Sequence, residues 1–152
     1  MLPFLRFSDV VKDGKAKVTG LFILKNAGLT VLPTLGDGHC LMHAIINSWK
    51  IQVPNINPPS LEKIKSLFFV EAMDFRDTYM NFDAGKITVS QYCSMLGKYI
   101  TEKRYNNVVV DYMPIMIATS LKINIYIIHD ENDSIRCEDI TPHRDTVAEH
   151  SI

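Results

Sequence analysis

The chain has 152 residues, of which 47% are hydrophobic and 22% are charged, and its formal net charge is −1. This length and composition are typical of one soluble globular domain and exclude a low-complexity or disordered chain. Lysines and arginines are spread along the sequence rather than clustered, so nucleic acid is not an expected partner.

The cysteine pattern and the first residues indicate a protein of a reducing compartment. Cys40, Cys93 and Cys137 are widely spaced and form no C-x-x-C pair, which argues against a zinc ribbon or a redox motif. The chain starts without the basic region and apolar run of a signal peptide. No stretch reaches the ~20 apolar residues of a membrane span. We therefore expect a cytoplasmic or nuclear protein that is not secreted and has no membrane partner.

The first half of the chain predicts a short strand at residues 21–24 and then two helices. A glycine-containing turn leads into a helix that begins at Cys40, and its apolar residues cover more than one stripe, which predicts nearly complete burial. After a proline-rich loop, Ser60 can cap a helix that runs to about Asn81, before the break at residues 83–85. The apolar face of this second helix is expected to consist of Ile64, Phe68, Ala72, Phe75 and Tyr79.

The second half predicts two more helices. Thr88 and Gln91 have the spacing of a capping box and open a helix that ends near residues 103–104. A turn at residues 106–107 separates it from a helix over residues 111–121. We expect three residues of the first of these helices to face inward: Tyr92, Leu96 and Tyr99.

Two strands are expected near the end of the chain. Residues 123–128 are a continuous apolar run, which is typical of a buried strand. Residues 130–133 indicate a loop, and residues 135–140 alternate between apolar and polar, which predicts a strand with one exposed face.

Cys40 stands where the turn becomes the first helix. Backbone N–H groups in the first turn of a helix have no intrahelical partner, and the aligned peptide dipoles add roughly half a positive charge there. Both effects favour a thiolate, and the same N–H groups can bind the oxyanion of a tetrahedral intermediate. The segment therefore supplies a candidate nucleophile, Cys40, and a candidate oxyanion site at Gly38, His39 and Cys40. The alternative is that Cys40 is a small buried hydrophobic residue, as most single cysteines are.

The same segment carries a resemblance to a known family. Asp37-Gly38-His39-Cys40-Leu41-Met42-His43-Ala44-Ile45 resembles the signature Asp-Gly-x-Cys-(Leu/Phe)-x-(Arg/His)-(Ala/Ser)-(Ile/Leu) of the OTU (ovarian tumour) family of cysteine proteases. Residues 112–121 and 123–128 are similar to that family's late helix and following strand. The resemblance covers residues 32–152, and residues 1–31 are an N-terminal extension or part of the same domain.

The resemblance implies an α+β, papain-like fold, in which helices flank a small central sheet and the nucleophile lies at the N-terminus of a buried helix. It implies a deubiquitinase whose cysteine attacks the carbonyl at the C-terminal glycine of ubiquitin and forms a thioester that water then hydrolyses. The expected partners are ubiquitin or polyubiquitin and also ubiquitin-like modifiers. The implied chemistry requires no metal and no organic cofactor.

The general base that the resemblance implies is a histidine late in the chain, and His150 has the best position. Family members usually follow this histidine with an aromatic residue and then Asp or Asn, whereas Ser151 and Ile152 follow here. Either His150 is the base, oriented by Asp37 or by a residue that is missing here, or the chain stops before the family's histidine and the domain is truncated. The residue that matches Asp37 belongs to the catalytic group in part of the family, so Asp37 is the third catalytic candidate.

Two other functions stay open. The first is a non-catalytic ubiquitin-binding module that keeps the fold but lacks a competent base. The second is a thiol acyltransferase or another papain-like hydrolase, which differs in whether ubiquitin is its substrate. Of the remaining histidines, His43 is expected to be a structural residue of the helix, and His129 and His143 are expected at the surface.

Overall fold

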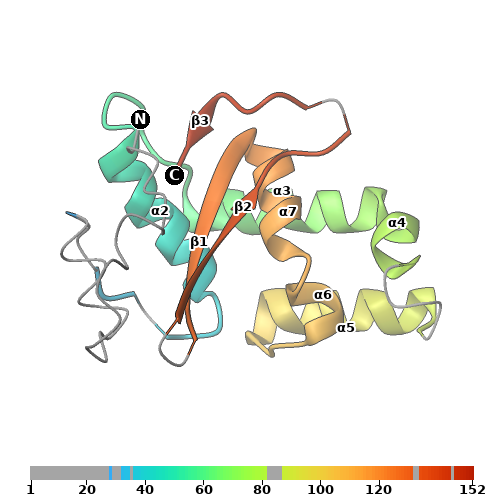
Figure 1. Cartoon of the computed structure of the whole chain (residues 1–152). Helices are drawn as coiled ribbons and strands as arrows, with labels where there is room; N and C mark the ends of the chain where they lie inside the picture. The colour runs from blue at the N-terminus through green and yellow to red at the C-terminus, as the bar shows by residue number, and fades with distance from the viewer. Residues whose placement is uncertain (1–27, 29–31, 35, 82–86, 132–133, 145) are drawn as a thin grey trace. The chain divides into compact units, whose positions relative to one another are not determined.

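The computed structural model describes residues 28, 32–34, 36–81, 87–131, 134–144 and 146–152. The chain forms two compact units. The helical unit comprises residues 34–125 and 140–152, and the strand unit comprises residues 1–33 and 126–139. The helices and the three-stranded sheet confirm the expected α+β class (Figure 1).

The helical unit is built around one central helix. Its helices, in chain order, are α2 (Cys40–Gln52), α3 (Leu61–Asp74), α4 (Arg76–Asn81), α5 (Val89–Glu102), α6 (Asn107–Val110) and α7 (Met113–Leu121). Helix α3 packs against α2, α4, α5 and α7. The core at these contacts includes four fully buried side chains: Phe68, Tyr92, Tyr99 and Met116. None of the described helices is long and apolar enough to cross a membrane.

Helix α2 begins at Cys40, as predicted, but it is less buried than its sequence indicates. Met42, Ile45 and Trp49 are buried, and they recur at the three- and four-residue spacing of one helix face. The apolar residues between them, such as Leu41 and Ile46, are only half-buried. The helix is therefore amphipathic, and the prediction of nearly complete burial is wrong.

The helix predicted from Ser60 to about Asn81 is two helices. Ser60 is the N-cap of α3, and its hydroxyl accepts a hydrogen bond from the backbone N–H of Lys63 at 3.1 Å. Phe75 ends α3 with a non-helical backbone and is 37% exposed, so its place in the predicted buried face is wrong. The other four members of that face are buried. The predicted strand at 21–24 and the break at 83–85 lie outside the described residues.

Helix α5 confirms the predicted capping box. The Thr88 hydroxyl accepts from the backbone N–H of Gln91 at 3.1 Å, and the Gln91 side chain accepts from the backbone N–H of Thr88 at 2.8 Å. The three residues expected to face inward, Tyr92, Leu96 and Tyr99, are all fully buried. The helix ends at Glu102, with Lys103 as its C-cap in the left-handed conformation.

Replacing Thr88 by Ala is expected to lower the free energy of unfolding by about 1 kcal/mol, because the loss of a hydroxyl N-cap leaves a first-turn N–H without its partner. Urea unfolding followed by circular dichroism measures the change. Thr101→Ala is the matched control, since the exposed Thr101 hydroxyl only donates to the Gly97 carbonyl within the same helix. Equal midpoints for the two variants would show that the cap contributes nothing.

The connection between α5 and α7 differs from the prediction. Asn106 is not part of a simple turn but the N-cap of α6, and its side chain accepts from the backbone N–H of Val108 at 2.9 Å. Asp111 is the C-cap of α6, and the next helix begins at Met113 rather than at residue 111 as predicted. Pro114 occupies the first turn of α7, where its missing N–H breaks no intrahelical bond.

The sheet consists of β1 (Ile123–Glu131), β2 (Ser134–Ile140) and β3 (His150–Ser151), in the order β2-β1-β3. Strands β1 and β3 are parallel, and Ile123 lies opposite His150. Strand β1 is longer than predicted and includes two residues that were expected in the following loop. In β2, residues 136–139 are all exposed, so the predicted alternation of buried and exposed residues is not observed there.

Candidate active site at the start of helix α2

Cys40 is the first residue of α2, and its side chain is exposed. The first turn of α2 contains no acidic residue, and the N-cap, His39, makes no side-chain capping bond. The partial positive charge of the helix N-terminus is therefore not neutralised by a carboxylate within that turn. The thiol predicted to be the nucleophile stands at the surface, where a substrate can reach it.

Asp37 organises the turn that precedes Cys40. Its Oδ1 accepts from the backbone N–H of His39 at 3.0 Å, while its Oδ2 contacts Lys103 Nζ at 2.7 Å and His43 Nε2 at 3.2 Å. The hydrogen bond from Lys103, followed by that from the His39 amide, holds the pKa of Asp37 well below its ordinary value. Asp37 is therefore an anion fixed by three donors, and Lys103 is a contact residue that lies 66 positions away in the sequence.

His39 is an internal anchor of this turn. Its side chain is completely buried, and its ring packs edge-on against Tyr99 with centroids 5.0 Å apart. Nε2 lies 2.9 Å from the Tyr99 carbonyl oxygen, which can only accept, so Nε2 carries the proton and donates. Nδ1 of His39 is buried and has no partner among the described residues.

The contacts of His39 bear on the predicted oxyanion site. The backbone N–H of His39 donates to Asp37, so in this conformation it is not free to bind an oxyanion. Among the described residues, no contact engages the backbone N–H groups of Gly38 and Cys40. These two amides are the candidates that the geometry leaves for the oxyanion.

Gly38 allows the turn to pack against the end of α5. Its φ is +90°, a conformation that side chains disfavour, and a Cβ at this position would lie 2.7 Å from the Lys103 carbonyl oxygen. Together with the bonds from Lys103 to Asp37 and from His39 to Tyr99, this contact fixes the Cys40 turn on the C-terminal end of α5. The α5 terminus is thus the support of the candidate site.

His43 is the histidine that the structure joins to the candidate site. It follows Cys40 by one helical turn, a spacing that places two side chains on the same side of a helix. Its Nε2 is bound to Asp37. From the sequence, His43 is predicted to be a structural residue, since helix spacing alone does not reveal that Asp37 folds back onto it.

His150 is placed elsewhere in the helical unit. Its ring packs edge-on against Trp49, with centroids 5.6 Å apart. Trp49 is nine residues after Cys40, which corresponds to about 13 Å along the axis of α2. Figure 1 shows β3, which begins with His150, beside the C-terminal end of α2 rather than beside its start. The structure therefore brings Asp37, His43 and Cys40 together but does not bring His150 to them.

An exposed aromatic side chain follows the C-terminal end of α5, which supports the Cys40 turn. Tyr105 is 61% exposed, and its hydroxyl donates to Asp111 Oδ1 at 3.2 Å. Partial burial, together with the charge and the hydrogen bond of Asp111, raises the pKa of Tyr105. Among the described residues, no group of three or more His, Cys, Asp and Glu side chains could hold a metal ion.

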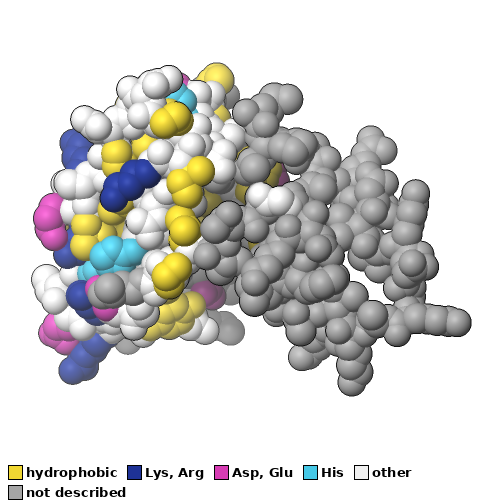
Figure 2. Space-filling model, turned by 90° about the vertical axis from the view of Figure 1, so that its left-hand side faces the viewer, with side chains coloured by type: hydrophobic (Ala, Val, Ile, Leu, Met, Phe, Trp, Pro, Cys, Tyr) yellow, Lys and Arg dark blue, Asp and Glu magenta, His cyan; other side chains and the backbone are white. Residues whose placement is uncertain are grey.

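Charged side chains do not gather into one large patch on the face that contains α2. Figure 2 shows the described cationic, anionic and histidine side chains singly or in small groups among hydrophobic ones. This distribution agrees with the net charge of −1 and offers no continuous basic surface to a polyanion on the described part of that face.

Comparison with protein-family models, with curated proteins and with solved structures gives no match for this chain. The α+β class is therefore established by the structure itself, and the assignment to a family remains a proposal.

Proposed function

We propose that this chain is a thiol hydrolase of the OTU type that cleaves the bond after the C-terminal glycine of ubiquitin or of a ubiquitin-like modifier. One observation carries the proposal: an exposed cysteine opens α2, and the turn before it is fixed by Asp37 and by the end of α5. The motif around Cys40 resembles the family's nucleophile signature, and its Asp and Gly have defined structural roles here.

In the proposed reaction, the Cys40 thiolate attacks the carbonyl carbon of the terminal glycine. The C–S bond forms, and the oxyanion is bound by the N–H groups of Gly38 and Cys40. The amine then leaves with a proton from the general acid, and a water molecule that loses a proton to the same group hydrolyses the thioester. The reaction needs no redox partner, and its net result is hydrolysis of one amide bond.

His43 is the base that we propose for this reaction in place of His150. Asp37 accepts a hydrogen bond from one ring nitrogen of His43, which orients the ring and leaves the other nitrogen for proton transfer. The arrangement contains a cysteine nucleophile, a histidine base and a carboxylate that orients the base, all within the seven residues 37–43. His150 packs on Trp49, so its participation would require β3 to move.

A second candidate function is a ubiquitin-binding module without hydrolase activity. The position of His150 favours it, because the histidine that the family resemblance implies as the base is not beside Cys40. The two functions differ in one property, the reaction of Cys40 with an electrophile presented by ubiquitin.

Labelling of the 1–152 chain with ubiquitin that carries a C-terminal electrophile tests the proposal. The proposal predicts one covalent adduct, which Cys40→Ser abolishes and which the matched control Cys137→Ser preserves, since Cys137 is also an exposed free thiol. His43→Gln is expected to slow labelling by about 10²-fold or more, the contribution of a general base, while His150→Gln leaves the rate unchanged.

Each alternative has its own pattern of results. Slowing by His150→Gln alone would reassign the base to His150 and refute the role of His43. Binding of unmodified ubiquitin without labelling, in a folded wild-type chain, would support the binding module. Neither labelling nor binding, with ubiquitin and with ubiquitin-like modifiers, would refute both functions.

A further inference from the structure

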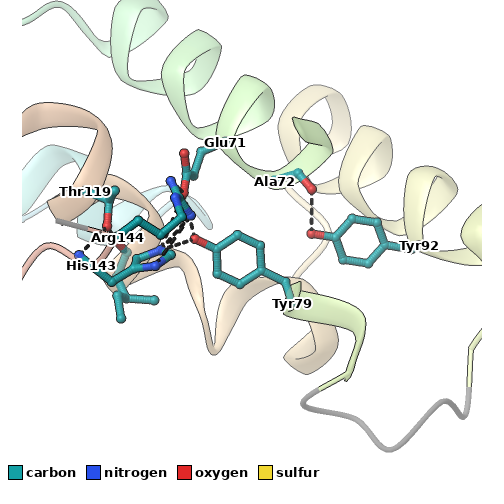
Figure 3. Close-up of polar contacts among 8 residues, drawn as sticks. Glu71, Ala72, Tyr79, Tyr92, Thr119, His143 and Arg144 are labelled. Atoms are coloured by element: carbon teal, nitrogen blue, oxygen red, sulfur yellow. Dashed lines mark hydrogen bonds and ion pairs between the residues drawn. The ribbon is translucent and has the colours of Figure 1, made fainter. Parts of the chain in front are cut away.

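A second cluster of titratable side chains lies away from Cys40, where three parts of the helical unit meet. Figure 3 shows Glu71 from α3, Tyr79 from α4, and His143 and Arg144 from the segment that connects β2 to β3. The side chains point toward one another and are only partly accessible. The proposed reaction uses none of them.

Glu71 is the buried centre of the cluster. Its side chain is 9% exposed, and its Oε1 accepts from the Tyr79 hydroxyl at 2.8 Å and from the Arg144 guanidinium. The Arg144 guanidinium also lies over the Phe75 ring, 3.4 Å from its centroid. Arg144 thus supplies the cation that compensates a carboxylate with little access to water.

His143 connects this centre to two other elements. Its Nε2 lies 2.7 Å from the Tyr79 hydroxyl, and its backbone N–H donates to the Thr119 hydroxyl of α7 at 3.2 Å. The Arg144 Nη1 lies 3.0 Å from one ring nitrogen of His143 and 3.4 Å from the other. The guanidinium can only donate, so it needs an acceptor nitrogen on the ring.

A neutral imidazole has one acceptor nitrogen, and an imidazolium has none. Protonation of His143 therefore removes the acceptor that faces Arg144 and places two cations side by side. Burial and the charge of Arg144 lower the pKa of His143, against the opposing attraction of Glu71. Among the described residues, the titratable side chains that contact His143 are these two and Tyr79.

The segment that carries His143 leads directly into β3. Beyond the cluster, it is held to the start of β1 by two backbone bonds, from Glu149 N–H to the Lys122 carbonyl at 2.7 Å and from Ile152 N–H to the Asn124 carbonyl at 3.0 Å. The cluster is thus the anchor of this segment on α3 and α4, and the pairing with β1 is its other anchor.

We propose that Glu71, Tyr79, His143 and Arg144 form an acid-sensitive latch, which holds the segment between β2 and β3 on α3 and α4 and releases it when His143 is protonated. The proposal does not depend on the hydrolase function.

The direction of the pH effect follows from linkage. The pKa of His143 is lowered while the segment is docked, and in the released segment it returns to the ordinary value of about 6.5. Above that value the ring is neutral in both states, and docking has its full strength. As the pH falls below this value, His143 takes up a proton in the released state but not in the docked state. Docking therefore weakens.

Hydrogen–deuterium exchange of the full chain at about pH 7.5 and about pH 5.5, corrected for the intrinsic pH dependence of exchange, tests the latch. We expect the amides of Glu149 and Ile152 to lose protection at the lower pH in the wild-type chain. His143→Gln keeps hydrogen-bonding atoms but does not titrate, so its protection should be equal at both pH values. His129→Gln is the control, because the half-buried His129 pairs with Glu138 in the strand unit, and it should behave like the wild type.

Two results in the wild-type chain would overturn the latch. The first is equal protection of the wild-type amides at the two pH values. The second is an NMR titration of the His143 ring in the wild-type chain that gives a pKa at or above the ordinary value, a measurement that needs no variant to fold. A loss of protection that persists in His143→Gln would assign the acid response to another group.

Discussion

Replacing Gly38 by Ala is expected to destabilise the protein by about 2–4 kcal/mol and to abolish fast labelling of Cys40. The backbone of Gly38 has φ +90°, which costs a residue with a Cβ roughly 1–3 kcal/mol. The new methyl group would lie 2.7 Å from the Lys103 carbonyl oxygen, so the turn must move away from the end of α5. Urea unfolding measures the first effect, and the rate of reaction with the ubiquitin electrophile measures the second.

Gly36→Ala is the matched control for this prediction. Gly36 lies in the same turn, but a Cβ there would meet nothing within 4 Å, and its φ does not lie in the left-handed range. We expect a change of less than about 1 kcal/mol for this variant. If Gly36→Ala and Gly38→Ala unfold at the same urea concentration, the close packing of the turn on α5 is not what holds it.

Local signals in the sequence predict the starts of α2, α3 and α5. Ser60 and Thr88 were identified as caps because a hydroxyl needs only the backbone three residues later, and both bonds are present. The sequence does not predict the end of α3 at Phe75, since an apolar residue at helical spacing is as expected within a helix as at its end. Residues 106–107 predict a turn, although the Asn106 side chain can also cap a helix, as it does in α6.

Only those residues of the candidate site that are close together in the sequence could be predicted. The sequence located Cys40 and Asp37 because both belong to one short motif. It could not identify Lys103 as the partner of Asp37, because that contact spans 66 residues and depends on how α5 packs against the turn. The preference for His150 rested on its late position alone, whereas the structure places it against Trp49 and joins His43 to Asp37.

Ion pairs between residues that are far apart in the sequence could not be predicted for the same reason. The sequence does not single out Glu71, which lies on the buried side of α3, because nothing near it in the sequence distinguishes it from the other charged residues of that helix. Its partner Arg144 is 73 residues away. The pair can be recognised only once the packing of α3 against the segment before β3 is known.

Replacing Arg144 by Met is expected to lower the free energy of unfolding by about 2–3 kcal/mol. Loss of one partner from a fully buried ion pair costs roughly 3–5 kcal/mol, and the Arg144 side chain is 30% exposed, which reduces the effect. The methionine retains most of the volume over Phe75 but leaves the Glu71 carboxylate without its cation. Urea unfolding at neutral pH measures the change.

A control variant and a double variant distinguish the loss of the Arg144 charge from the loss of its packing. Arg104→Met removes an arginine whose pair with Glu102 is exposed, at 70% and 50%, and this change should cost at most about 1 kcal/mol. Combining Glu71→Gln with Arg144→Met removes the buried charge together with its cation, so the double variant should be more stable than Arg144→Met alone. If the double variant is instead less stable by the sum of the two single changes, Glu71 and Arg144 act independently. The junction of α3, α4 and the segment before β3 would then be held by packing rather than by this pair.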